Sequence, residues 1–136
     1  MTKILVVEDE GHVRELLVDL LEDAGYEVVE AAAGDTALQQ ASLHLPDVII
    51  LDLMLPVLDG FQVLERLKSN PDTRSIPVIV ATARDQKPDE MKARTAGAAD
   101  YLSKPWEHGE VESKVKNIEL SHLGPFASPD MLQSPW

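Results

Sequence analysis

Short runs of apolar and β-branched residues alternate with segments of helical periodicity along most of this chain. These apolar runs predict five buried strands, at residues 3–8, 26–31, 47–52, 76–82 and 99–103. Apolar residues recur at three- and four-residue spacing between and after them, which predicts helices over residues 13–24, 35–43, 60–69, 88–96 and 107–121. Because strands that alternate with helices form parallel sheets with right-handed crossovers, this order predicts a (βα)5 α/β domain with helices on both faces of one sheet.

Several residues sharpen this pattern. The run at 47–52 is apolar on both faces, which is typical of a central strand. Asp59 can cap the helix at 60–69, Pro88 suits the first position of the next helix, and Gly97 can end it. The first helix is expected to end at Gly25. Its predicted core-facing stripe consists of Val13, Leu16, Leu17, Leu20, Leu21 and Ala24.

Polar side chains follow four of the five predicted strands. Strand one ends in Glu8 and Asp9, strand three in Asp52 and strand four in Thr82, and strand five runs into Lys104. Binding sites in open parallel α/β sheets lie beyond the carboxyl ends of the strands, so these groups should converge on one edge. Strand two ends in alanines instead, which suggests that it lies to one side of the site.

The chemistry of these groups favours a metal-dependent phosphoryl site. Three neighbouring carboxylates repel one another unless a cation neutralises them, and an all-oxygen set favours Mg²⁺ or Mn²⁺. A carboxylate beside such an ion can attack phosphorus, while Lys104 and Thr82 could stabilise the phosphoryl oxygens. Taken singly, the acid pair could cap a helix, Thr82 could be an ordinary strand residue and Lys104 a surface charge. Their joint placement at the strand ends favours the site.

Composition limits the class of protein further. The 136 residues, 44% of them hydrophobic, suit one compact domain. A net charge of −12, from 24 acidic and 12 basic residues, argues against direct contact with nucleic acid. The sequence has no cysteine and no apolar run near the roughly 18 residues of a membrane span. Its first residues, MTKILVVEDE, are not expected to be a signal peptide, because acidic residues follow only a few apolar ones. We therefore expect a cytoplasmic protein without membrane contact.

The motifs that carry these residues resemble the receiver domain of bacterial two-component response regulators. In chain order they are VVEDE, PDVIILDLMLPVLDGFQVL, PVIVATA and GAADYLSKPW. The resemblance covers about residues 2–120 and implies a three-layer, flavodoxin-like sandwich with strand order 2-1-3-4-5. It also implies a receiver domain over residues 1–120, followed at 121–136 by a tail or the start of a linker.

The resemblance assigns roles to the acidic residues. Asp52 matches the phospho-acceptor, Asp9 the direct metal ligand and Glu8 an outer acid that acts partly through water. The backbone carbonyl of Met54 matches the third protein ligand of the ion. Val57 departs from the family pattern, because a glycine is common at this position of the loop.

The remaining matches concern the switch. Thr82 resembles the switch hydroxyl, Lys104 the phosphate-pairing lysine, and Tyr101 the aromatic residue whose ring turns inward when Thr82 moves. The bond between Lys104 and Pro105 is expected to be cis. Met54 and Arg84 occupy positions that tune the lifetime of the phosphoryl group in this family.

The resemblance implies a phosphorylation-activated switch rather than an enzyme, assisting only its own phosphorylation and dephosphorylation. Asp52 would accept the phosphoryl group from a sensor histidine kinase or a phosphotransfer protein. The signal would pass through the face formed by residues 88–96, 99–103 and 107–121 to a downstream protein or output domain, with a homodimer as one phosphorylated form.

Two alternatives remain. One is a phosphorylation-independent interaction module with the same fold. The other is an aspartyl-phosphate phosphatase of the haloacid dehalogenase type, which usually has a second acid where this chain has Met54. Whether the chain is a stand-alone regulator or the receiver of a longer protein stays open.

Overall fold

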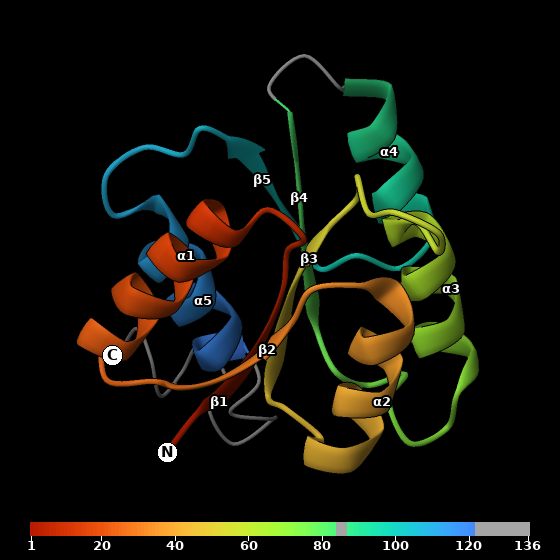
Figure 1. Ribbon diagram of the computed structural model, residues 1–136, viewed down its shortest axis with the longest axis horizontal. Helices are drawn as coiled ribbons and strands as arrows, with labels where there is room; N and C mark the ends of the chain where they lie inside the picture. The colour runs from red at the N-terminus through yellow and green to blue at the C-terminus, as the bar shows by residue number, and fades with distance from the viewer. Residues whose placement is uncertain (84–86, 122–136) are drawn as a thin grey trace.

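The computed structural model describes residues 1–83 and 87–121. Its elements are β1 (Lys3–Val7), α1 (Gly11–Asp23), β2 (Glu27–Ala31), α2 (Gly34–His44), β3 (Val48–Asp52), α3 (Gly60–Ser69), β4 (Val78–Ala83), α4 (Lys87–Thr95), β5 (Asp100–Lys104) and α5 (Glu110–Ser121). The strands form one parallel sheet of order β2-β1-β3-β4-β5. Helices α1 and α5 lie on one face, and α2, α3 and α4 on the other (Figure 1). The predicted flavodoxin-like (βα)5 fold and its strand order are confirmed.

Strand β3 is the centre of the sheet. All five of its residues are buried, and it pairs with β1 on one side and β4 on the other. Its apolar residues therefore serve both faces, as the continuous apolar run predicted. The predicted placement of β2 at an edge is also correct. The register sets Asp52 beside Ala81 of β4, so Thr82 lies one residue further toward the carboxyl edge.

Two cores hold the helices against the sheet. Successive strand residues point to opposite faces, so β1 contributes Leu5 and Val7 to one core and Ile4 and Val6 to the other. The core under α2, α3 and α4 also contains Ala37, Ala41, Val63, Leu64, Leu67 and Ala93. The core under α1 and α5 contains Leu17, Leu21, Val111, Val115 and Ile118. Both layers consist of buried apolar residues, and their packing fixes the strand ends that carry the polar residues.

The ends of the helices follow the predicted signals. Asp59 caps α3: its Oδ1 accepts from the amide of Gln62 at 3.0 Å, and Gln62 Oε1 accepts from the amide of Asp59 at 3.0 Å. This reciprocal capping box satisfies two amides that the helix leaves free. Gly25 and Gly97 have φ values of +96° and +109°, which glycine adopts readily, and each directly follows the last turn of its helix.

Two local features differ from the sequence pattern. Leu16 and Ala24 of the predicted stripe are exposed, because the face of α1 that meets the sheet is narrower and centres on Leu17 and Leu21. Helix α5 begins at Glu110 rather than 107, since Gly109 has a φ of +81° that a helix cannot contain. The other predicted boundaries agree within one or two residues.

Val57, in the loop after β3, has a φ of +65° and is fully exposed. A β-branched residue in this left-handed region is strained. Glycine adopts this conformation without strain, which agrees with the family pattern that predicts glycine in place of Val57.

Within residues 1–83 and 87–121, none of the helices combines the length with the apolar character needed to span a bilayer.

Candidate functional site

Three carboxylates meet at the carboxyl edge of the sheet. Glu8 and Asp9 directly follow β1, and Asp52 is the last residue of β3. Each offers a carboxylate oxygen, and these oxygens all lie within 4.8 Å of one another. The side chains of Glu8 and Asp52 are buried, whereas Asp9 is exposed. The predicted convergence of these acids is therefore present, and an all-oxygen set of this charge suits a hard divalent cation.

Lys104 supplies the positive charge of the cluster. Its Nζ lies 2.5 Å from Glu8 Oε1 and 3.3 Å from Asp52 Oδ2, although Lys104 is 96 residues from Glu8 in the chain. Lys104 is the last residue of β5, and the bond that follows it to Pro105 is cis, as expected. The ammonium thus lies between the two buried carboxylates.

The pKa values of Glu8 and Lys104 are both raised, but for different reasons. Burial raises the pKa of the Glu8 carboxyl, and the hydrogen bond from Lys104 offsets only part of that rise. Burial alone would lower the pKa of Lys104, but the hydrogen bond to Glu8 and the charge of Asp52 outweigh it and raise the pKa. Lys104 therefore stays protonated at neutral pH and holds the cluster together.

The turn after β3 orients Asp52. Its Oδ1 accepts from the amide of Met54 at 3.0 Å, so the carboxylate is held by its own loop. Gly60 begins α3 against the backbone of this turn: a Cβ on Gly60 would lie 2.4 Å from the Leu53 Cα and 2.5 Å from the Asp52 carbonyl oxygen. Only glycine permits this approach. The role of the Met54 carbonyl as a metal ligand stays a prediction.

Thr82 presents a donor that is not used. Its side chain is fully buried in β4, and among the described residues its Oγ1 has no hydrogen-bond partner. A buried hydroxyl without a partner costs free energy, which an additional acceptor at the site would recover. Tyr101 of β5 is buried, with 9% of its surface exposed. Arg84 lies outside the described residues.

An apolar hollow of about 480 Å³ borders Asp52 and Lys104. It is lined by Val13 and Leu16 of α1, Met54, and Trp106 after β5. Sequence reasoning missed this surface because it assigned Leu16 to the core. The available signal was that Val13 and Leu16, three residues apart, lie in the first turns of the helix that follows the acid pair.

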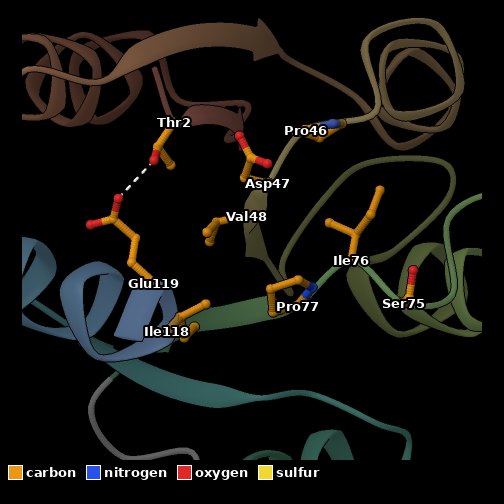
Figure 2. A pocket seen from close by; sticks show the side chains of 9 residues that line it. All are labelled: Thr2, Pro46, Asp47, Val48, Ser75, Ile76, Pro77, Ile118 and Glu119. Carbon is orange, nitrogen blue, oxygen red and sulfur yellow. Dashed lines mark hydrogen bonds between the residues drawn. The ribbon is translucent and has the colours of Figure 1, made fainter. Parts of the chain in front are cut away.

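A second hollow of about 460 Å³ lies away from these acids, at the amino-terminal edge of the sheet (Figure 2). Its two carboxylates are already engaged. Asp47 accepts from the amide of Lys3 at 2.8 Å, and Glu119 accepts from the hydroxyls of Thr2 and Tyr26 at 2.7 and 2.8 Å. The contacts of Glu119 join α5 to the residues that precede β1 and β2, so the polar groups of this hollow have a structural role.

Comparison with known proteins agrees with this fold and site. The model of the response regulator receiver domain matches residues 4–116, so the chain belongs to this family. It is 37% identical over 131 residues to the phosphate regulon transcriptional regulatory protein PhoB of Escherichia coli K12, covering 96% of this chain and 57% of that protein. It is 41% identical over 116 residues to the alkaline phosphatase synthesis transcriptional regulatory protein PhoP of Bacillus subtilis, covering 85% of this chain and 48% of that protein. The chain thus spans about half the length of these curated relatives.

Solved structures show the same domain. A putative response regulator from Chloroflexus aurantiacus superimposes with a TM-score of 0.83 at 41% identity, over 86% of this chain and 96% of that one. The receiver domain of the sensor histidine kinase PA1611 from Pseudomonas aeruginosa superimposes with a TM-score of 0.80 at 31% identity, over 87% and 98%. That domain has a magnesium ion coordinated in its active site cleft. The predicted class, a receiver domain of two-component response regulators, is therefore confirmed.

Proposed function

We propose that this domain is a phosphorylation-activated switch whose phospho-acceptor is Asp52. One observation carries the proposal: a buried carboxylate ends the central strand, beside two further acids and 3.3 Å from an ammonium group. The phosphoryl donor is the phosphohistidine of a sensor histidine kinase or phosphotransfer protein. The domain is not a general enzyme, but assists its own phosphorylation and dephosphorylation.

The acid cluster is proposed to hold Mg²⁺ or Mn²⁺. Asp9 and Asp52 would bind the ion directly, Glu8 partly through water, and Met54 through its carbonyl oxygen. The donor set fits, because all of these groups present oxygen and three are carboxylates within 4.8 Å of one another. When bound, the ion supplies positive charge that offsets the phosphoryl oxygens.

The transfer itself is a displacement at phosphorus. One oxygen of the Asp52 carboxylate attacks, the new P–O bond forms and the P–N bond to the donor imidazole breaks. The imidazole keeps the electron pair of that bond and takes a proton from water. Lys104 is already at Asp52, so its ammonium can neutralise part of the charge on the phosphoryl oxygens.

Phosphorylation then changes which contacts are available. It adds about −1.5 to −2 charge and three acceptor oxygens at Asp52. The unpartnered hydroxyl of Thr82 gains an acceptor only in the phosphorylated state, and Lys104 shifts from Glu8 toward the phosphoryl group. This difference in contacts biases a two-state equilibrium, with Tyr101 reporting it on β5.

The readout surface is proposed to be the face of α4, β5 and α5. Partners would be a downstream protein, an output domain, or a second copy in a phosphorylated homodimer. The net charge of −12 makes direct contact with nucleic acid by this chain unfavourable. We propose that the receiver spans residues 1–120 of a cytoplasmic protein without membrane contact. Residues 121–136 are proposed to be a tail or the start of a linker, and all of them except Ser121 lie outside the described residues.

Phosphorylation with acetyl phosphate and Mg²⁺ tests this function, with intact mass as the readout. The parent and Asp72→Asn should gain one phosphoryl group, whereas Asp52→Asn should gain none. Asp72 is a suitable control because it is exposed and lies in the loop after α3. Labelling of Asp52→Asn, or of neither the parent nor the control, would contradict the proposal.

We also propose that the phosphoryl group decays slowly by self-hydrolysis. Met54 is 67% exposed and lines the hollow beside Asp52, where its apolar side chain can exclude attacking water. Arg84, outside the described residues, is proposed to act with it. Met54→Asn should shorten the phosphoryl half-life, and an unchanged half-life would end this idea.

A further inference from the structure

Arg14, in the first half of α1, contacts the backbone of the acidic turn rather than its carboxylates. Its Nη1 donates to the carbonyl oxygen of Glu8 at 2.8 Å, and its Nε donates to Glu30 Oε1 at 3.1 Å. The Arg14 side chain is 23% exposed and that of Glu30 is 50% exposed. One guanidinium therefore joins α1 to the end of β1 and the end of β2.

The carbonyl that Arg14 binds belongs to the peptide group between Glu8 and Asp9. The backbone angles ψ of Glu8 and φ of Asp9, which flank this peptide group, set the path of the chain through the turn and so the relative placement of the two acidic residues. On the other side of the turn, the amide of Glu8 donates to the carbonyl oxygen of Ala31 at 3.1 Å. The main chain at Glu8 is thus held from two directions, by β2 through its amide and by α1 through its carbonyl.

Arginine suits this task better than lysine. Its planar fork presents several donors in fixed directions, so one donor can bind Glu30 while another binds the Glu8 carbonyl. A lysine ammonium carries the same charge but has no fixed orientation. Glu30, at the carboxyl end of β2, keeps the guanidinium pointed at the turn.

We propose that Arg14 is a positioning residue for the divalent-cation site, holding the Glu8–Asp9 turn in the geometry that binds the ion. This inference rests on the proposed function, because it requires that the acid cluster bind a divalent cation. Groups that orient metal ligands typically contribute about tenfold to a hundredfold in metal affinity. A backbone contact at the turn should act at the lower end of that range.

The direction in which replacing Arg14 changes the affinity for a divalent cation distinguishes a positioning role from an effect of its charge. A guanidinium near the site repels a divalent cation, so if its charge mattered most, removing it would tighten binding. If its position matters most, removing it weakens binding. Arg14→Met removes charge and fork together, Arg14→Lys keeps the charge, and Arg66→Met removes an exposed charge on α3 as a matched control.

Mn²⁺ binding is measured from the electron paramagnetic resonance signal of the free ion. Arg14→Met should bind Mn²⁺ about tenfold more weakly than the parent, Arg14→Lys should fall between them, and Arg66→Met should match the parent. Phosphorylation by acetyl phosphate should require correspondingly more Mg²⁺ in Arg14→Met and recover the parental rate once Mg²⁺ saturates. This shift in metal requirement at constant maximal rate is the signature of positioning.

Equal or tighter Mn²⁺ binding by a folded Arg14→Met overturns the inference. If Arg14→Met does not fold, the test rests on Arg14→Lys. An Mn²⁺ affinity of Arg14→Lys equal to that of the parent then overturns the inference. Failure of the proposed function looks different: the parent itself would then bind no Mn²⁺, or would bind it without gaining a phosphoryl group at Asp52.

Discussion

Replacing Lys104 with methionine should destabilise the metal-free domain much more than replacing Lys114, although the two lysine side chains are equally accessible, at 25% and 23% exposed. The difference lies in their partners. Lys104 pairs with Glu8 and Asp52, whose side chains are 2% and 4% exposed, whereas Lys114 pairs with Asp100, which is 24% exposed. Buried carboxylates that lose their cation retain their desolvation cost, while exposed ones recover water.

The distances set the magnitude. With an effective dielectric constant of about 20, separations of 2.5 and 3.3 Å correspond to gross attractions of roughly 7 and 5 kcal/mol. Desolvation of the ammonium offsets most of this sum, and breaking a buried pair typically costs about 3–5 kcal/mol. Because Lys104 is a quarter exposed, we expect Lys104→Met to lower the unfolding free energy by about 3 kcal/mol at pH 7. Lys114→Met should cost at most about 1 kcal/mol.

Urea unfolding followed by circular dichroism, in EDTA and in Mg²⁺, measures both effects. Mg²⁺ at a hundred times its dissociation constant adds about 2.7 kcal/mol to the unfolding free energy, and it should stabilise Lys104→Met more than the parent, since no ammonium then competes for the acids.

The effect of Lys104→Met should also depend on pH. The folded pKa of Glu8 is raised, so its favourable contribution to stability is present below pH 4.5 and is lost as the pH rises through the folded value. The difference in unfolding free energy between the parent and Lys104→Met should therefore become smaller as the pH falls. Equal losses for both lysines, or greater Mg²⁺ stabilisation of the parent, would refute the reasoning.

Three further predictions concern the scaffold. Val57→Gly should raise the unfolding free energy by about 0.5–1 kcal/mol in urea unfolding, because it removes a left-handed β-branched residue that buries nothing, and a loss of stability would contradict this. Gly60→Ala should lower the unfolding free energy by about 2 kcal/mol, since the new Cβ would clash with the Leu53 backbone. An unfolding free energy equal to that of the parent would show that α3 can move to make room for the Cβ. Burial and the bond to Glu119 raise the pKa of Tyr26 to about 12, so the stability it contributes is present below pH 10 and is lost as the pH rises through 12. Comparing the tyrosinate absorbance of the parent with that of Tyr26→Phe isolates the titration of Tyr26, which should occur near pH 12. Titration near pH 10 would disprove the contact between Tyr26 and Glu119.

The position of the candidate site was predictable because it requires only that the strands be parallel. Asp52 ends the most apolar run, and Glu8, Thr82 and Lys104 each lie within one residue of the carboxyl end of another strand, so a parallel sheet brings them to one edge. The order of the strands came from the resemblance, since hydrophobic periodicity does not specify which strands are neighbours.

Features that depend on side-chain geometry were not predictable. The spacing of Leu16 suits a core position, but the width of the buried face on α1 depends on how the helix packs on the sheet. The contact of Arg14 with the Glu8 carbonyl joins a side chain to a backbone atom and leaves no pattern in the sequence. Val57 was visible as an unusual residue, but only the backbone angle identifies the strain.

The location of Asp52 on β3 has a consequence for the energetics of switching. Strand β3 is hydrogen-bonded on both sides and wholly buried, so its amides should exchange with solvent only when the whole domain unfolds. Among residues 1–83 and 87–121, strand β5 pairs with β4 alone and lies at the edge of the sheet, so it can open at lower free energy. Under the proposed function, the phosphoryl group would be attached to the most protected strand, and its effect would be read on a less protected one. A small change in contacts at Asp52 could then shift the conformations of β5 without unfolding the strand that carries Asp52.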